Sequence, residues 1–181
     1  HYPMVQYEIY TADGDDIREK LDRGSIDLGI LVEPVETAKY EFFRLPYVDT
    51  WGVLLRKDDP LAERDTLRIA DLKDKPLFLP RRSLVQNELE SWLGIDAAGI
   101  RVQGVHNLLT NASLLVKAGL GRLISIDGAV HIRPDPDTCF IPLTPKHTSG
   151  HVLAWRKNQL LPTAATKFIE QLKMLFKYDI Q

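Results

Sequence analysis

The stretch from Ile17 to Val32 constrains the fold most strongly, because it joins a helix, a helix-termination signal and an apolar strand. Asp15 and Asp16 stand where an N-cap and a first-turn acid belong, so a helix is predicted to begin there. Gly24 can adopt the left-handed conformation that ends a helix without a steric clash. The run from Leu28 to Val32 is apolar without alternation. Such a strand is usually covered on both faces, which indicates an α/β sheet.

A further strand is predicted before this helix, at residues 5–10, where apolar and polar residues alternate. The loop Thr11–Gly14 joins it to the helix, so the chain opens as strand, loop, helix and strand. A crossover of this kind predicts a parallel pair of strands. Ligands of such sheets bind where loops leave the carboxyl ends of the strands, here at Thr11–Gly14 and after Val32.

The rest of the chain continues the alternation of strands and helices. Apolar, strand-like runs occupy residues 50–55, 77–79, 100–105, 121–126 and 151–155. Helices are predicted at 67–74, 84–93, 107–118 and 162–178, the last with Phe168, Leu172 and Leu175 facing the core. This order of elements is typical of an α/β protein.

Length and charge restrict the class of protein. With 181 residues, 44% of them hydrophobic, the chain can form one large domain or two small lobes. The formal net charge of −2 gives no general attraction to nucleic acid or anionic lipid. No segment is long and apolar enough to span a bilayer, and the single cysteine excludes an internal disulfide. These features favour a cytoplasmic protein and argue against a membrane partner.

Signatures of catalysis, metal binding and cofactor binding are absent from the sequence, so we expect no catalytic residue, metal or cofactor. His147 and His151 are four residues apart, but Ser-Gly between them favours a surface loop over a metal pair. Cys139 could be paired with His131 or His106 as a nucleophile. Because no local signature supports such a pair, a buried, inert thiol is the better interpretation.

Polar residues gather instead in three loops that each precede a helix start. Free N–H groups and the positive end of a helix favour an anion there, and the adjacent guanidinium groups of Arg81 and Arg82 suit a carboxylate or phosphate. The alternatives are that both arginines are simply solvated, and that Asn107 and Thr110 are only the cap and a first-turn residue of a helix. The candidates are Thr11, Asp13 and Gly14; Pro80, Arg81, Arg82 and Ser83; and His106, Asn107, Leu108, Thr110 and Asn111.

Five segments in order resemble the effector-binding, or substrate-binding, domain of LysR-type transcriptional regulators. No single segment is diagnostic, but the set covers nearly the whole chain in the order and spacing of that family. The segments are HYPMVQYEIY at 1–10, KLDRGSIDLGIL at 20–31, VLLRKDDPLA at 53–62, VKAGLGRLISI at 116–126 and HVLAWRKN at 151–158.

The resemblance implies a type 2 periplasmic-binding-protein-like fold, in which two α/β lobes are joined by two crossing strands and hold a small effector in the cleft between them. Lobe one would comprise residues 1–56 and 143–181, and lobe two residues 57–142. By position in the family, the effector-binding residues would be Thr11, Gly14, Val32, Pro80, Arg81, Arg82, Asn107 and Thr110.

Relative to the family pattern, the N-terminal winged helix-turn-helix and the linker helix are missing, as are the first strand and helix of lobe one. The resemblance implies a regulatory domain that senses a small effector and reaches DNA only through the missing N-terminal domain, and the arginine loop indicates that this effector is anionic. It also implies a homodimer or homotetramer in the cytoplasm. Two alternatives share the fold: a solute-binding protein of a transporter, and an enzyme such as a deaminase. The second is disfavoured because no paired carboxylates or activated nucleophile are present.

Overall fold

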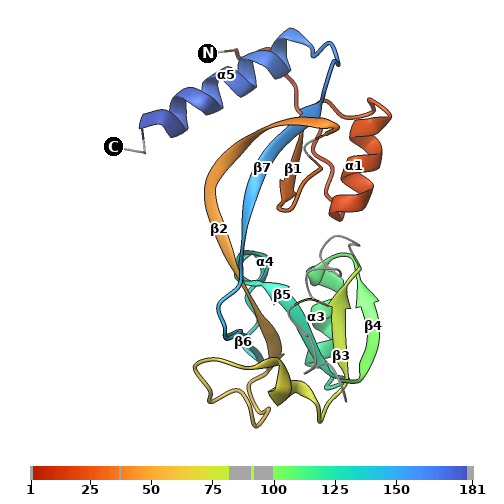
Figure 1. Ribbon diagram of the computed structural model, residues 1–181, viewed down its shortest axis with the longest axis vertical. Helices are drawn as coiled ribbons and strands as arrows, with labels where there is room; N and C mark the ends of the chain where they lie inside the picture. The colour runs from red at the N-terminus through yellow and green to blue at the C-terminus, as the bar shows by residue number, and fades with distance from the viewer. Residues whose placement is uncertain (1, 37, 82–90, 92–99, 179–181) are drawn as a thin grey trace. The chain divides into compact units, whose positions relative to one another are not determined.

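The computed structural model describes residues 2–36, 38–81, 91 and 100–178, and the chain divides into two compact units (Figure 1). Unit 1 comprises residues 1–47 and 150–181, and unit 2 comprises residues 48–149. The chain leaves unit 1 within strand β2 (Tyr40–Arg56) and returns within strand β7 (Thr148–Arg156). The assignment of lobes with boundaries at residues 56 and 143 remains a prediction.

The first helix of unit 1 is α1 (Gly14–Asp22), and the side chain of Asp13 caps its amino end. The carboxylate of Asp13, buried at the N-cap, accepts hydrogen bonds from the backbone N–H groups of Asp15 (3.1 Å) and Asp16 (3.0 Å). The cap is therefore Asp13, whereas Asp15 and Asp16 lie in the first turn. Gly24 follows the helix with φ of +66°, as predicted from its position.

Strand β1 (Gly29–Val32) pairs with β7 in antiparallel register, Gly29 opposite Ala154 and Val32 opposite His151. The predicted parallel βαβ start is wrong, because residues 5–10 form no strand and lack a ladder partner among the described residues. Burial on both faces is also wrong, since Ile30 is 63% exposed. An antiparallel strand alternates between a buried and an open face, which its uniformly apolar sequence did not reveal.

Helix α5 (Thr163–Tyr178) packs on unit 1 through a different stripe from the predicted one. The buried residues are Ala165, Ile169 and Phe176, spaced for one helical face, with Leu172 packed against the same cluster as Ile169. The predicted core residues Phe168 (36% exposed) and Leu175 (60% exposed) lie one position away from this stripe. Both of those assignments are wrong.

Unit 2 contains a mixed sheet in the order β2-β5-β3-β4, with a further strand, β6, also paired to β2. Strand β3 is parallel to its neighbours β4 and β5, whereas β2 is antiparallel to β5 and β6. The elements are a 3-10 turn η1 (Ile69–Leu72), β3 (Leu77–Pro80), β4 (Val102–His106), α3 (Leu109–Lys117), β5 (Arg122–Ile126), α4 (Asp127–His131) and β6 (Thr138–Pro142). The helix predicted at 84–93 falls almost entirely outside the described residues.

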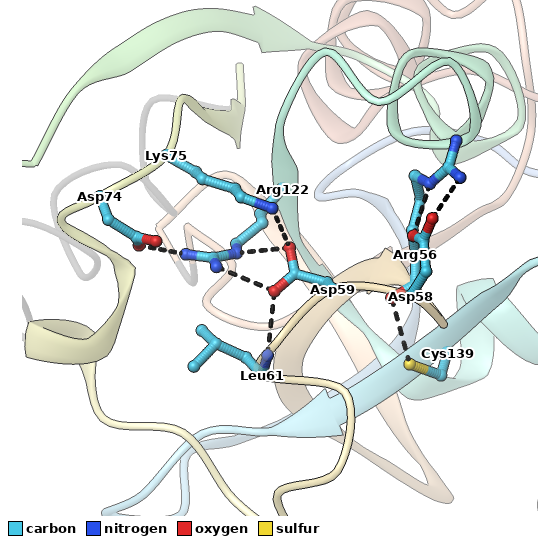
Figure 2. A network of polar contacts seen from close by, with 8 residues as sticks. All are labelled: Arg56, Asp58, Asp59, Leu61, Asp74, Lys75, Arg122 and Cys139. Carbon is cyan, nitrogen blue, oxygen red and sulfur yellow. Dashed lines mark hydrogen bonds and ion pairs between the residues drawn. The ribbon is translucent and has the colours of Figure 1, made fainter.

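A buried ion-pair network ties β5 to the loops at its amino end, and Figure 2 shows Arg122, Lys75 and Leu61 meeting at the carboxylate of Asp59. The guanidinium of Arg122, 1% exposed, donates to both carboxylate oxygens of Asp59 (3.1 and 2.9 Å) and to Asp74 (2.6 Å). Lys75 Nζ and the N–H of Leu61 also donate to Asp59, each at 3.0 Å. Each of the three guanidinium nitrogens of Arg122 is therefore paired with a carboxylate oxygen.

Candidate functional site

Three strands of unit 2 place their carboxyl ends along one edge of the sheet. Pro80, the last residue of β3, lies opposite His106, the last residue of β4, and the N–H of Arg81 donates to the carbonyl of His106 at 2.7 Å. Strand β5 runs parallel to β3, so its end at Ile126 opens on the same edge. The structure thus brings Pro80, Arg81 and the residue after β4, Asn107, together at the edge where ligands of parallel sheets bind.

Helix α3 starts at this edge without a side-chain cap. Leu108 occupies the N-cap position and offers no acceptor, so the prediction that Asn107 caps the helix is wrong. Asn107 is exposed, and its Oδ1 accepts from the N–H of Leu108 at 2.9 Å. Thr110 is exposed in the first turn. Because the N-cap side chain satisfies none of the first N–H groups of α3, these groups and the positive end of the helix can bind an anion.

His106 adds a buried acceptor to this edge. Its Nε2 lies 3.2 Å from the carbonyl of Ile124, and because a carbonyl only accepts, Nε2 carries the proton. Burial lowers the pKa of His106 despite the bond to that carbonyl, so the ring is neutral at pH 7. Nδ1 is then an acceptor, and it is buried without a hydrogen-bond partner among the described residues. A group with an O–H or N–H is the complement of this atom.

Sequence reasoning named His106 among the polar residues of its loop but left it out of the predicted site. The sequence signal that could have included His106 was its position at the end of a predicted strand, where ligands of parallel sheets bind. Arg81 is exposed beside it, so a cationic side chain and a neutral imidazole stand at neighbouring strand ends. Arg82, the second predicted arginine, lies outside the described residues.

The three predicted residues of unit 1 flank one apolar cluster. Thr11 is exposed, Gly14 is the first residue of α1, and Val32 is the last residue of β1. Ala12 and Leu31, their neighbours in sequence, pack in the same cluster. The structure therefore brings the loop before α1 close to the end of β1 within unit 1.

The structure gives no support for a nucleophilic cysteine or a metal site among the described residues. Burial raises the pKa of the Cys139 thiol, which disfavours the nucleophilic thiolate. Among the described residues, no group of three or more His, Cys, Asp or Glu side chains could hold a metal ion. No helix in that part of the chain is long and apolar enough to cross a membrane.

Comparison with known proteins identifies the family. The model of the family described as LysR substrate binding domain matches residues 1–177. The chain is 26% identical over 176 residues to the "Uncharacterized HTH-type transcriptional regulator YvbU" of Bacillus subtilis (strain 168). The aligned region covers 97% of this chain and 59% of that protein. The chain thus spans about three fifths of the length of this curated relative.

Two solved structures have the same fold. The regulatory domain of Synechocystis PCC6803 CcmR in complex with 2-PG gives a TM-score of 0.81 at 16% identity, covering 96% of this chain and 85% of that chain. The effector binding domain of QuiR in complex with shikimate gives 0.80 at 19% identity, covering 94% and 81%. The predicted α/β fold of the periplasmic-binding-protein-like class is thereby confirmed. Since the family model spans nearly the whole sequence, this chain belongs to the LysR substrate binding domain family.

Proposed function

We propose that this chain is the effector-sensing domain of a LysR-type transcriptional regulator and that it binds a small anion at the carboxyl edge of β5, β3 and β4. The observations that carry the proposal are that Arg81, His106 and the start of α3 lie at that edge, and that Nδ1 of His106 has no hydrogen-bond partner among the described residues. A guanidinium and free N–H groups bind carboxylate or phosphate oxygens. Nδ1 selects a ligand that also carries a hydroxyl or N–H.

The ligand acts by changing an equilibrium. It shifts the protein between two states only if it binds one of them more tightly, and the difference in affinity sets the size of the response. We propose that the response reaches DNA through a winged helix-turn-helix outside this sequence, in a homodimeric or homotetrameric, cytoplasmic regulator. In support, the B. subtilis relative is named an HTH-type regulator and is longer than this chain.

Binding, rather than transport or catalysis, is the role we assign. By name, the relative and the structures described above are a transcriptional regulator, a regulatory domain and an effector binding domain. None of them is a transporter component, so the solute-binding alternative has no support among them. Two of these neighbours were solved with a small molecule bound, 2-PG in one and shikimate in the other. Their shared fold is thus compatible with a small-molecule sensor that has no catalytic activity.

Thermal unfolding of the 181-residue chain with a panel of small carboxylates and phosphates tests the proposal. A ligand at one hundred times its Kd stabilises the folded state by about 2.7 kcal/mol, which gives a shift of several degrees. Titration calorimetry of the stabilising compound then compares Arg81→Gln with Arg101→Gln. Arg101 is exposed and precedes β4, so it lies at the opposite, amino end of that strand and is a matched control.

Loss of one charge-assisted hydrogen bond corresponds to about 1.5–3 kcal/mol, or roughly ten- to hundredfold in affinity. We expect that loss for Arg81→Gln and no change for Arg101→Gln. His106→Phe should discriminate against compounds with a hydroxyl or N–H donor and spare those without one. Equal weakening by both arginine variants would contradict a site at the carboxyl edge.

A further inference from the structure

Unit 2 contains a hollow of about 450 Å³ that is built from other residues than the strand-end site. It lies among the part of β2 that belongs to unit 2, helix α4, strand β6 and the loop that follows β6. The volume falls within the range of pockets that hold small molecules. Its lining combines an apolar part, formed by Phe140, Pro142 and Leu143, with a polar part that includes Asp127, His131 and Lys146.

The apolar part is fixed by close packing on β2. A Cβ at Gly52 would lie 2.3 Å from Cζ of Phe140, so only glycine lets this ring rest directly on the β2 backbone. Gly52 is also in register with Pro142. The aromatic ring and the proline are thus held in place without a ligand, and a flat apolar body can lie against them.

The rim is fixed by backbone hydrogen bonds. The N–H of Leu143 donates to the carbonyl of Trp51 at 3.0 Å, and the N–H of Trp51 donates to the carbonyl of His147 at 2.9 Å. Both ends of the loop carrying Lys146 are therefore attached to one residue of β2. The N–H of Thr144 is bonded in turn to the carbonyl of Leu67 at 2.8 Å. Lys146 consequently projects from a short, anchored loop.

The polar groups of the hollow differ in what they already bind. Oδ1 of Asp127 accepts from the N–H groups of Thr50 and Gly128, each at 2.9 Å, so its charge is partly compensated. The side chains of Lys146, His131 and Thr50 make no hydrogen bond or ion pair with any residue that the structure describes. A cation, an imidazole and a hydroxyl are therefore left to bind a ligand, beside an apolar surface.

We propose that this hollow is a second small-molecule site, which takes a carboxylate carrying a compact apolar body. The carboxylate binds Lys146, and the apolar body packs on Phe140 and Leu143. Thr50 lies three residues after the boundary between the units in β2, and Lys146 lies four residues before the boundary in β7. An occupant therefore contacts both segments of unit 2 that continue into unit 1.

Three probes with the same ring test the chemistry: benzoate, benzyl alcohol and benzylamine. Each is titrated into the isotope-labelled 181-residue chain, and the amide resonances of Thr50, Thr144 and Lys146 are followed by NMR. We expect saturable shifts with benzoate, at least tenfold weaker binding of benzyl alcohol, and no saturable shift with benzylamine. Lys146→Gln should weaken benzoate at least tenfold, while the exposed, matched control Lys57→Gln leaves it unchanged.

Arg81→Gln separates the two sites, because it affects the strand-end site and should not alter the benzoate shifts at Thr50 and Thr144. Lys146 is exposed, so Lys146→Gln should fold, and Lys146→Arg should restore binding. Preference for benzylamine would overturn the proposal by assigning the site to Asp127. Absence of saturable shifts, or shifts that persist in Lys146→Gln, would overturn it as well.

Discussion

Substitution of Asp59 by asparagine should destabilise the protein strongly, because this carboxylate compensates the buried charge of Arg122. Its two oxygens accept four hydrogen bonds, two from Arg122 and one each from Lys75 and the N–H of Leu61 (Figure 2). An asparagine keeps the volume but brings an NH₂ group against donors and removes the negative charge. Among the described carboxylates, only Asp74, whose side chain is 64% exposed, then pairs with the guanidinium.

The loss of stability expected for Asp59→Asn follows from the burial of the ion pair. Removing one partner of a buried ion pair costs about 3–5 kcal/mol, whereas an exposed pair contributes about 0–1 kcal/mol. The side chains of Arg122 and Asp59 are 1% and 6% exposed, so the first range applies. In a chain of this size the loss lowers Tm by roughly 6–20 °C. The exposed pair Glu19–Arg23 is the control, and Glu19→Gln should cost less than about 1 kcal/mol.

Urea unfolding followed by tryptophan fluorescence measures both free energies. The double variant Asp59→Asn with Arg122→Met removes both charges, so we expect it to be less destabilised than the sum of the single variants, by about 2 kcal/mol. If Asp59→Asn costs under about 1 kcal/mol, or if the two substitutions are additive, the network does not stabilise unit 2 as argued.

Acid should remove the same contribution in the wild-type protein. Burial raises the pKa of Asp59, but hydrogen bonds from Arg122, Leu61 N–H and Lys75 outweigh it and bring the pKa from 3.8 down to about 2. Because the folded-state pKa is the lower one, the stabilisation is complete above about pH 4 and is lost as the pH falls towards 2. Urea midpoints between pH 6 and 2 should therefore fall more steeply for the wild type than for Asp59→Asn.

Three further substitutions test local packing and capping. Gly52→Ala should destabilise by at least about 1–3 kcal/mol in urea unfolding, because its Cβ would overlap the ring of Phe140; an unchanged midpoint would refute the close approach. Trp51→Phe removes the buried 2.8 Å hydrogen bond from Nε1 to Ser149 Oγ and should lower the free energy of unfolding in urea by about 1–3 kcal/mol. An unchanged free energy would refute a stabilising role for this hydrogen bond. Asp13→Ala should cost about 1 kcal/mol and lower helical circular dichroism, whereas Asp13→Asn should retain most of the cap.

The candidate site was predictable where local chemistry decides it. Pro80, Arg81 and Asn107 follow apolar runs and precede a helix start or a break, and that pattern placed them correctly at strand ends. His106 was not included in the predicted site, because its ability to accept a hydrogen bond at Nδ1 depends on the imidazole tautomer. That tautomer is fixed by the carbonyl of Ile124, 18 residues away. The hollow beside β2 was not predicted either, since β2, α4 and the loop after β6 meet only in the folded chain.

Sequence alone determined the elements whose signals are local: helix α1 with its terminating Gly24, the apolar strands of unit 2 and the α/β class. The tertiary structure decided everything that depends on a neighbour. It left residues 5–10 without a ladder partner among the described residues, made β1 antiparallel to β7, and turned Ile169 rather than Phe168 inward. Helix propensity and capping act within a few residues, whereas strand pairing and the buried face of a helix are set by whatever the rest of the chain places beside them.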